Sequence, residues 1–335
     1  MKGFSLIIVT WNGLHHLQNF LPSVAATNYP DFEIILADNN STDGSKEWVT
    51  EQFPQVKIAA FDGNYGYTGG NNRALPFASK EILLFLNNDV EVTPDWLHGL
   101  NSAFDNETVG ASQPKMLAYN EPEYFEYAGA AGGYLDRLGY PFCRGRILFS
   151  YEKDEGQYDN PAELTWASGA ALAIRKKLFE ELGGFDEDFE FHMEEIDLCW
   201  RLRNRGFKIL FAPTSTVYHL GGGSLPMGST QKVFYNFRNS LFMLLKNLPE
   251  HELWYKLLLR LKLDGIAAIR SLISGRPGEF RAIFKAHMHF YKMAGKMKAK
   301  RYEGKPASTE GILSPVLIVW QYFIKGHKKF TDFMK

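Results

Sequence analysis

The sequence predicts an α/β fold with a mostly parallel, doubly wound sheet, on two observations. Residues 4–10, "FSLIIVT", form a continuous apolar run, which is typical of a parallel strand buried on both faces. The next segment, "GLHHLQNFLPSVAAT", carries its apolar side chains at helical spacing. This strand-then-helix order repeats up to about residue 110, and it favours crossover connections between parallel strands.

Further strands are predicted from "FEIILADN", "VKIAAFD" and "EILLFLNND", with helices starting at "STDGSKEWVTEQF" and "GGNNRALPFAS" between them. In doubly wound sheets, ligands bind at the carboxyl ends of the strands. Polar side chains gather at several of these predicted strand ends, which indicates a ligand site. A polar residue at a single strand end would indicate only an ordinary turn. The polar residues at the predicted strand ends are Thr10, Asn12, Asp38, Asn39, Asn64 and Asp89.

The rest of the chain divides into a middle part and a helical tail. Residues 110–164 are rich in Gly, Tyr and acidic residues without a clear period, and they predict irregular loops with short strands. "LTWASGAALAIRKKLFEELGGF" predicts a strand followed by a helix, and "KILFAPTSTVYHLGGGS" predicts a strand with a polar exit. From about Phe234 helical segments predominate, so we expect a C-terminal helical extension.

Composition limits the classes of function. The chain has 335 residues, of which 45% are hydrophobic and 15% aromatic, so it can bury a sizeable core and is not globally disordered. Its formal net charge of −1 hides an asymmetry, because from His251 onward there are 17 Lys and Arg against 6 Asp and Glu. An acidic body thus carries a basic tail, whose charges could face anionic lipid, nucleic acid or water. We expect no nucleic-acid partner.

Three features bear on location. Cys143 and Cys199 are too few for a disulfide framework, and the apolar run at residues 4–9 is too short for a signal peptide. The longest late apolar run, residues 312–324, holds 13 residues and a proline, whereas a membrane span needs roughly 20. We therefore expect a cytoplasmic protein without a transmembrane helix. Peripheral attachment to the inner face of the cytoplasmic membrane is a further expectation.

Two stretches offer metal ligands, and each has a plainer alternative. In "LFLNNDVEV", Asp89 ends a buried strand, where a carboxylate suits Mg²⁺ or Mn²⁺ held together with substrate phosphates. Asparagines at such positions are also common turn formers. In "VYHLGGGS", His219 follows a strand beside glycines that allow close approach of the backbone, although a lone histidine is more often structural. The chain has neither GxGxxG after its first strand nor GxxxxGK[ST], so no dinucleotide-binding fingerprint or P-loop is predicted.

Taken together, these stretches resemble the family 2 glycosyltransferases of the GT-A fold, in particular the bacterial rhamnosyltransferase-like branch. The resemblance implies a Rossmann-like, mostly parallel sheet flanked by helices. It assigns residues 1–230 to a nucleotide-sugar-binding and catalytic domain and residues 231–335 to a basic, mainly helical C-terminal region. The matching stretches, in family order over about residues 4–224, are "IIVTWNG", "ILADNNSTDGS", "NYGYTGGNNRA", "LFLNNDV", "WASGAALAIRK", "GGFDEDFEFHMEEIDLCWR" and "VYHLGGGS".

The resemblance also implies a chemistry: an inverting, hexosyltransferase-like enzyme that uses a divalent metal, Mn²⁺ or Mg²⁺. It would move a sugar from a nucleoside-diphosphate sugar to a hydroxyl of a glycan or lipid-linked acceptor, in the synthesis of bacterial surface polysaccharide or another glycan. By family position, the donor nucleotide is bound by Thr10, Asn12, Asp38 and Asn88. By the same match, the metal ligands are Asp89 and His219, the base is Glu195, and the donor sugar or acceptor is bordered by Trp166, Gly169 and Glu194. Asn64, at a predicted strand end, and Arg73, which could contact a phosphate, are further expected donor-binding residues. The family's DxD motif falls on residues 87–89, where the first position is Asn87.

Helical spacing separates the carboxylates of "FHMEEIDLCWRLRNRGF". On a helix, Glu195 shares a side with Leu198 and Leu202, whereas Asp197 can pair with Arg201. A carboxylate bordered by apolar groups can have a raised pKa, which suits proton abstraction. The plainer alternative is that these acids only complement the helix dipole. The family often has Asp where this chain has Glu195, which leaves the detailed geometry of the base open.

Two other classes of function fit parts of the pattern. A nucleotidyltransferase also combines an α/β fold, acidic residues and a metal, but "TWNGLHHL" lacks the basic Gly-rich loop expected near its N-terminus. A catalytically degenerate nucleotide-sugar-binding protein would not need to retain Glu195, Asp89 and His219.

The tail also allows two interpretations. Apolar and basic residues interleave in it, as they do in helices that lie on a membrane surface. The alternative is that its apolar faces pack on the catalytic domain or on a second copy of the chain in a homodimer. The apolar residues concerned are Trp254, Leu257, Leu258, Leu261, Phe284, Phe290 and Tyr291.

Overall fold

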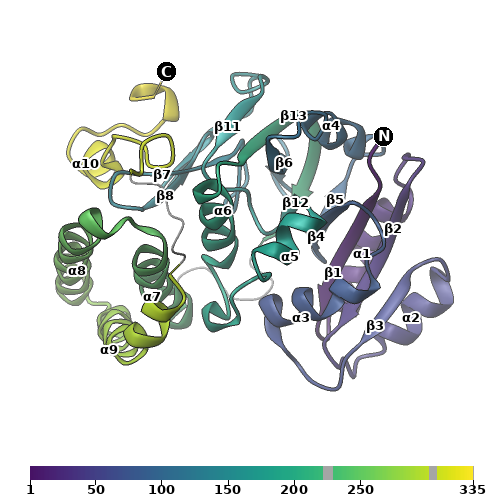
Figure 1. Ribbon diagram of the computed structural model, residues 1–335, viewed down its shortest axis with the longest axis horizontal. Helices are drawn as coiled ribbons and strands as arrows, with labels where there is room; N and C mark the ends of the chain where they lie inside the picture. The colour runs from purple at the N-terminus through teal and green to yellow at the C-terminus, as the bar shows by residue number, and fades with distance from the viewer. Residues whose placement is uncertain (222–228, 302–307, 335) are drawn as a thin grey trace.

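The computed structural model describes residues 1–221, 229–301 and 308–334, and its centre is a nine-stranded sheet (Figure 1). The strand order is β11-β13-β6-β12-β4-β1-β2-β3, and β5 pairs with β13. The strands are β1 (Phe4–Thr10), β2 (Phe32–Asp38), β3 (Lys57–Ala60), β4 (Ile82–Asn87), β5 (Val90–Val92), β6 (Val109–Ala118), β11 (Ala162–Leu164), β12 (Ala171–Arg175) and β13 (Lys208–His219).

The predicted α/β fold is confirmed. Strands β3, β2, β1 and β4 run parallel, as the alternation of strands and helices predicts. Strand β12 is antiparallel to both β4 and β6, so the other half of the sheet is mixed. The run at β1 is buried on both faces, because Leu6 and Ile8 join one apolar cluster and Ile7 joins the other.

Helices cover the sheet and connect its parallel strands. Their apolar spacing explains their orientation: α1, for example, buries Leu17, Leu21 and Val24 against the cluster that contains Leu6. The helices of this part are α1 (Leu14–Ala25), α2 (Ser45–Gln52), α3 (Gly66–Ala74), α4 (Trp96–Ala103), α5 (Lys176–Glu181) and α6 (Glu194–Asn204).

The prediction of irregular structure after residue 110 is wrong for β6, a ten-residue strand inside the sheet. Polar residues interrupt its apolar run and hide its strand character, yet they are buried and bonded. Ser112 Oγ donates to the Leu210 carbonyl at 2.9 Å, and Gln113 Nε2 donates to the Gly129 carbonyl at 2.9 Å. The remainder has the predicted short strands, which form a small second sheet of β7 (Gly133–Leu135), β8 (Pro141–Cys143), β9 (Arg146–Ile147) and β10 (Ser150–Tyr151).

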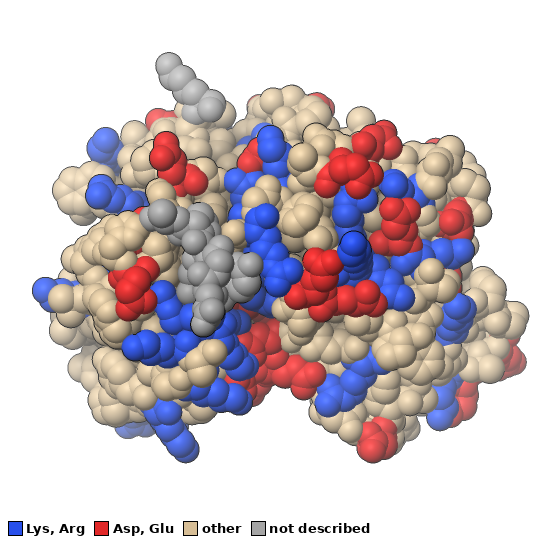
Figure 2. All heavy atoms as spheres, in the orientation of Figure 1, with Lys and Arg blue, Asp and Glu red and all other residues tan. Residues whose placement is uncertain are grey.

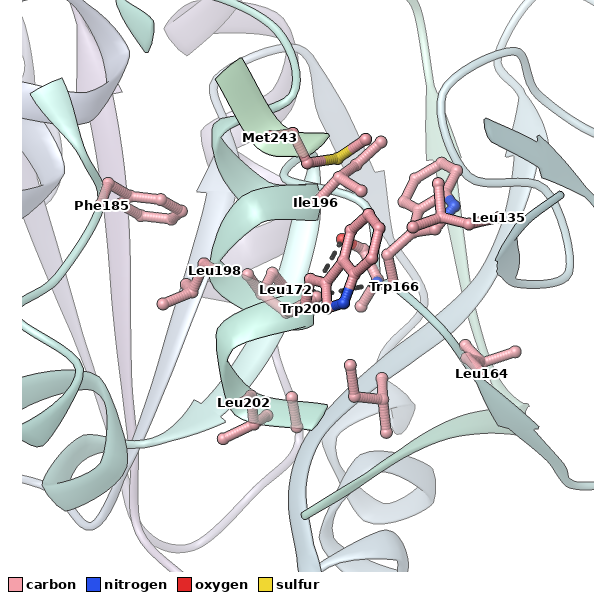
Figure 3. Packing of buried hydrophobic residues seen from close by; sticks show 14 of the residues in the cluster. Leu135, Leu164, Trp166, Leu172, Phe185, Ile196, Leu198, Trp200, Leu202 and Met243 are labelled. Carbon is pink, nitrogen blue, oxygen red and sulfur yellow. Dashed lines mark hydrogen bonds between the residues drawn. The ribbon is translucent and has the colours of Figure 1, made fainter. Parts of the chain in front are cut away.

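The predicted helical extension is confirmed, and it shares its core with the sheet. Ile196 and Trp200 of α6 lie in the same apolar cluster as Met243 of α7 (Figure 3). The division of the chain at residue 230 into two domains stays a prediction. In the described ranges, no helix combines the length and the hydropathy needed to cross a membrane. The helices are α7 (Thr230–Asn247), α8 (Glu250–Ile273), α9 (Pro277–Ala299) and α10 (Ile318–Phe323).

Candidate active site

The carboxyl ends of β1, β2 and β4 bring several of the predicted donor-binding residues together. The parallel register places Thr10 beside Asp38, and Val9 beside Asn87. Asn88 Nδ2 donates to Thr10 Oγ1 at 3.2 Å, and the Asp38 carboxylate accepts from the Ser41 backbone amide. Thr10 and Asp38 are buried at this edge. The sequence therefore predicted which residues meet here, since strand ends of a parallel sheet share one edge.

Asn12 ties two strand-end loops together. Its side-chain oxygen accepts from the Thr42 backbone amide at 2.8 Å, and its backbone amide donates to Ser41 Oγ at 2.9 Å. Its φ of 50° lies in the left-handed region, where asparagine is tolerated better than most residues. Asn12 thus shapes the loop beside Thr10 through its backbone as well as its side chain.

Asn64 and Arg73, which the sequence analysis assigns to the donor nucleotide, are engaged with protein groups around α3. Asn64 Oδ1 accepts from the Gly66 amide at 2.9 Å, at the start of the helix. The Arg73 guanidinium lies 3.7 Å from the centre of the Tyr65 ring and 3.0 Å from Glu187 Oε1. A direct role of either side chain with a nucleotide stays a prediction.

Asp89, His219 and Glu126 form a buried row beside this edge. Pairing of β5 with β13 sets His219 opposite Val90, so its ring reaches Asp89. His219 Nε2 lies 3.2 Å from Asp89 Oδ1, and His219 Nδ1 lies 3.1 Å from Glu126 Oε1. Burial alone would lower the pKa of His219, but the charges of Glu126 and Asp89 outweigh it and raise that pKa to about 10. The sequence gave no sign of Glu126, which lies in a stretch without period.

The Asp89–His219 pair fits a divalent metal. Two ligand atoms at neighbouring positions of an octahedral ion, each about 2.1 Å from it, lie about 3 Å apart. Asp89 Oδ1 and His219 Nε2 have nearly that spacing, and Glu126 stands where metal-binding histidines usually have an orienting carboxylate. Within the described ranges, no three His, Cys, Asp or Glu are arranged to hold an ion by themselves. Further ligands would have to come from substrate phosphates, as is usual for Mg²⁺.

The turn before α6 has a strained backbone. Glu190, His192 and Met193 have φ angles of 62°, 65° and 70°, in the left-handed region that non-glycine residues rarely adopt. Such conformations cost roughly 1–3 kcal/mol each and persist only where the surroundings hold them. Asn239 and Arg238 of α7 supply that support through hydrogen bonds to backbone carbonyls of the turn.

Two carboxylate residues, Glu194 and Glu195, directly follow the strained turn and begin α6. Neither Glu194 Oε2 nor Glu195 Oε2 has a hydrogen-bond partner among the described residues. Burial, together with the charge of Glu195, raises the pKa of Glu194 well above its ordinary value. Burial likewise raises the pKa of Glu195 to about 7, against the opposing effect of nearby backbone amides. Glu195 can therefore exchange a proton near neutral pH.

Gly169 connects Glu195 to the strand end that carries Asp89. A Cβ atom built on Gly169 would lie 3.6 Å from the Glu195 Cβ and 3.0 Å from the Tyr67 hydroxyl, so only glycine fits without displacement. Tyr67 donates from that hydroxyl to the Gly169 carbonyl at 2.7 Å. The next carbonyl, of Ala170, accepts from the Asn87 amide at 3.0 Å. Tyr67 is a residue that sequence reasoning missed, because a single tyrosine in this stretch gives no sign of a contact more than 100 residues away.

Asp197 has a structural environment, as its helical spacing predicted. It is fully buried and accepts from Arg201 Nε at 2.8 Å. Lys246 Nζ and Asn247 Nδ2 of α7 also donate to it, each at 2.8 Å. Burial would raise the pKa of Asp197, but Lys246 and Arg201 outweigh burial and lower it. Both of its oxygens thus accept from protein donors.

Trp166 does not lie where a sugar could contact it. The resemblance placed it at the border of the donor sugar or acceptor, but it is 3% exposed and belongs to the apolar core (Figure 3). Its indole nitrogen donates to the Tyr134 carbonyl at 2.9 Å, and its ring fills the space beside Gly133. The tryptophan of "WASG" points inward from its loop, and a role of Gly169 beside the donor sugar or acceptor stays a prediction.

Comparison with known proteins agrees with this geometry. The model of the family "Glycosyl transferase family 2" matches residues 5–183. O-antigen biosynthesis protein RfbC of Myxococcus xanthus is 36% identical over 208 residues, which are 58% of this chain but only 16% of that protein's length. N-acetylglucosaminyl-diphospho-decaprenol L-rhamnosyltransferase of Mycobacterium tuberculosis is 26% identical over 286 residues, 79% of this chain and 91% of that protein.

Among solved structures, GalNAc-T7 with UDP, GalNAc and Mn²⁺ is similar, with a TM-score of 0.58 at 19% identity. The match covers 73% of this chain and 48% of that one, and it shows a shared GT-A fold. The family model, the relatives and the fold agree with one another and with the arrangement of the strand ends. The chain belongs to glycosyl transferase family 2, and its relatives include rhamnosyltransferases.

Proposed function

We propose that this chain is an inverting, divalent-metal-dependent glycosyltransferase that uses Glu195 as its general base. One observation carries the proposal: the buried Glu195 carboxylate, whose Oε2 has no hydrogen-bond partner among the described residues, lies against Gly169, and the next carbonyl, of Ala170, accepts from the Asn87 amide at the strand end that leads to Asp89. Burial raises the pKa of Glu195 to about 7. A base with a pKa near the working pH is the most effective one for general-base catalysis. Through Ala170 and Asn87, this group is connected to the edge of the sheet that holds Thr10 and Asp38.

Each residue has a distinct role in the proposed reaction. Glu195 Oε2 accepts the proton of the acceptor hydroxyl. At the same time the hydroxyl oxygen forms a bond to the anomeric carbon, from the side opposite the nucleoside diphosphate. The bond from that carbon to the diphosphate oxygen breaks at the same time, so configuration inverts. Asp89 and His219 would hold the divalent metal, which as a Lewis acid neutralises charge on the departing diphosphate. Thr10, Asp38 and Asn88 would orient the nucleoside, which lowers the entropic part of the barrier.

The relatives indicate the substrate class. The Mycobacterium tuberculosis relative is named for L-rhamnose transfer to an N-acetylglucosaminyl-diphospho-lipid, and the Myxococcus xanthus relative for O-antigen synthesis. We propose a hydroxyl of a glycan or lipid-linked saccharide as the acceptor, within bacterial surface polysaccharide or glycan synthesis. Since the RfbC match spans a small part of that protein, its whole activity supports only this general class.

The test is nucleoside diphosphate release from UDP-, GDP- and dTDP-sugars with Mn²⁺ or Mg²⁺ and a panel of saccharide acceptors. We expect metal-dependent transfer with one donor, and NMR of the product should show the anomeric configuration opposite to that of the donor. Glu195→Gln should lower transfer without lowering donor binding. Retained configuration would contradict the single displacement, and pyrophosphate release in place of nucleoside diphosphate would indicate a nucleotidyltransferase.

A further inference from the structure

Helix α8 buries four charged residues and exposes large apolar ones, although Leu253 and Leu257 are buried as well. Four charged residues, Glu252, Lys256, Arg260 and Asp264, point into the protein, and Asp264 is 1% exposed. Large apolar side chains cover the opposite side, where Ile273 is 82% exposed. Those used below are Trp254, Leu258, Ile266, Ile269, Leu272 and Ile273, which we call the outer face of α8.

The buried charges fix this orientation. Arg260 donates to the Leu138 carbonyl and to Ser240 Oγ, each at 2.9 Å, and its guanidinium lies 3.6 Å from the centre of the Tyr140 ring. Asp264 Oδ2 lies 3.3 Å from His287 Nε2 of α9. Rotating α8 to hide its apolar side would strip buried charges of these partners, which is strongly unfavourable. The outer face therefore stays outside.

The outer face continues into α10. The Arg270 guanidinium of α8 lies 4.9 Å from the centre of the Phe323 ring, so the two helices adjoin. Trp320, Phe323 and Ile324 are exposed there as well. Among the described residues, 12 of the 22 exposed large apolar side chains lie on α8 or in residues 317–324. Such a concentration marks an interaction surface, since monomeric soluble proteins rarely expose large contiguous apolar patches.

The charges beside this surface identify what covers it. Between Trp254 and Ile273 the exposed charged residues are Lys262 and Arg270, and Lys325 follows α10, so all three are basic. In Figure 2 the left side of the molecule, over α8, is mainly uncharged, and Lys and Arg gather below it over α9. In a two-fold dimer the same patch meets itself, which would oppose like charges. An anionic bilayer instead accepts apolar side chains and attracts the basic rim.

We propose that the outer face of α8, with the exposed side of α10, docks on an anionic lipid surface. This corrects the sequence-based set of contact residues, because Leu257 and Phe290 are buried whereas Trp254 and Leu258 are exposed. The docking would hold the protein at the surface where a lipid-linked acceptor resides, but it does not depend on the proposed chemistry.

Vesicle flotation of the full chain tests the proposal, with vesicles of phosphatidylglycerol and phosphatidylcholine against phosphatidylcholine alone. We expect binding to the anionic vesicles that weakens at high salt. The triple variant Leu258→Ser, Ile269→Ser and Ile273→Ser should bind at least about tenfold more weakly. A matched control, Phe77→Ser with Tyr119→Ser, removes exposed aromatic rings from the catalytic part and should bind normally. Glu195→Gln should also bind normally, which separates this proposal from the catalytic one.

Two results would overturn the proposal. One is binding that the triple substitution leaves unchanged. The other is a dimer in solution that the triple substitution converts to monomer, without vesicle binding by the parent protein, which would make the face a subunit interface. Should the triple variant fail to fold by circular dichroism, Lys262→Glu with Lys325→Glu decides, because these exposed reversals should abolish the preference for anionic vesicles.

Discussion

The side-chain amide of Asn239 donates to the carbonyl oxygen of His192 at 2.8 Å, although 47 residues separate them in the chain. The same amide lies 2.8 Å from the Phe189 carbonyl and 2.7 Å from the Phe191 carbonyl. One buried residue of α7 thus gathers three carbonyls of the left-handed turn that presents Glu195. The proposed base is positioned from a helix that lies outside the predicted catalytic domain.

Asn239→Ala should therefore slow the chemical step. We expect kcat to fall roughly 10- to 100-fold, because small displacements of a reacting group are costly in rate, while donor binding stays near normal. Kinetics with saturating donor, together with donor titration, check this. Ser240→Ala, which alters the contact with Arg260 but not the turn, is the matched control. Equal kcat in Asn239→Ala and the parent enzyme would remove the positioning role.

Glu195→Gln should lower transfer by about 10²–10⁴-fold, the usual contribution of a general base, because the amide accepts no proton. Glu195→Asp should keep part of the activity. Since the pKa of Glu195 is raised to about 7, the rate of the parent enzyme should rise with pH up to about that value. The pH–rate profile measures this, and the same rising limb in Glu195→Gln would mean that another group titrates.

The contribution of Glu195 to the free energy of unfolding should fall as pH rises, whereas the reaction rate should rise. Below its ordinary pKa of 4.5, Glu195 is protonated in both the folded and the unfolded chain and contributes nothing. As pH rises from there to about 7, only the unfolded chain gains from ionisation, so the folded state loses stability. At about 1.4 kcal/mol per pKa unit, the loss reaches the order of 3 kcal/mol.

Glu195→Gln should therefore raise the free energy of unfolding near pH 8 and change it little near pH 4. Denaturant titrations at the two pH values measure the difference. Glu47→Gln on α2, where the side chain is exposed, should show no such pH dependence. A Glu195→Gln protein that is less stable than the parent near pH 8 would contradict the burial of this carboxyl.

Asp197→Asn should act mainly on stability. The substitution removes the carboxylate of Asp197 that pairs with the buried Lys246. Breaking a buried ion pair typically costs 3–5 kcal/mol of unfolding free energy. The residual activity per folded molecule should stay within a few-fold of the parent. Glu181→Gln, which removes surface pairs with Lys177 and Arg205, should change stability by less than about 1 kcal/mol. A stable but inactive Asp197→Asn protein would mean that Asp197, and not Glu195, takes the proton.

Glu126→Gln should weaken Mn²⁺ binding about 10- to 100-fold, as loss of an orienting carboxylate behind a metal-binding histidine commonly does. Electron paramagnetic resonance titration of Mn²⁺ with nucleoside diphosphate present measures the affinity without requiring turnover. Glu123→Gln, at an exposed position three residues away, is the control. Unchanged Mn²⁺ affinity in Glu126→Gln would show that the carboxylate only neutralises His219.

The parallel half of the sheet and the edge where its polar strand ends meet were predictable because their causes are local. An apolar run such as residues 4–10 identifies a buried strand without knowledge of its neighbours, and parallel strands bring Thr10 and Asp38 to one edge by geometry alone. The pairing of Asp197 with Arg201 was predictable for the same reason, since four residues make one turn of a helix.

The remaining parts depend on contacts distant in sequence. Strand β6 carries buried Ser112 and Gln113, whose partners lie on β13 and near Gly129, so its own residues do not identify it as a strand. Glu126 and Asn239 act through single contacts across the fold and leave no periodic signal. Helix α8 has a regular apolar pattern, but the pattern alone does not tell which side is outside.

The ion pairs of α6 have a consequence for truncation. Lys246 of α7 pairs with both Asp197 and Asp186, and Lys300, which follows α9, also pairs with Asp186. A chain cut after residue 230 would keep every side chain that we propose for catalysis and metal binding. It would, however, remove the lysines that pair with Asp186 and Asp197 and expose part of the core. Residues 1–230 are therefore not expected to be an autonomous folding unit, because the basic C-terminal region supplies the counter-charges that allow the helix carrying Glu195 to be buried.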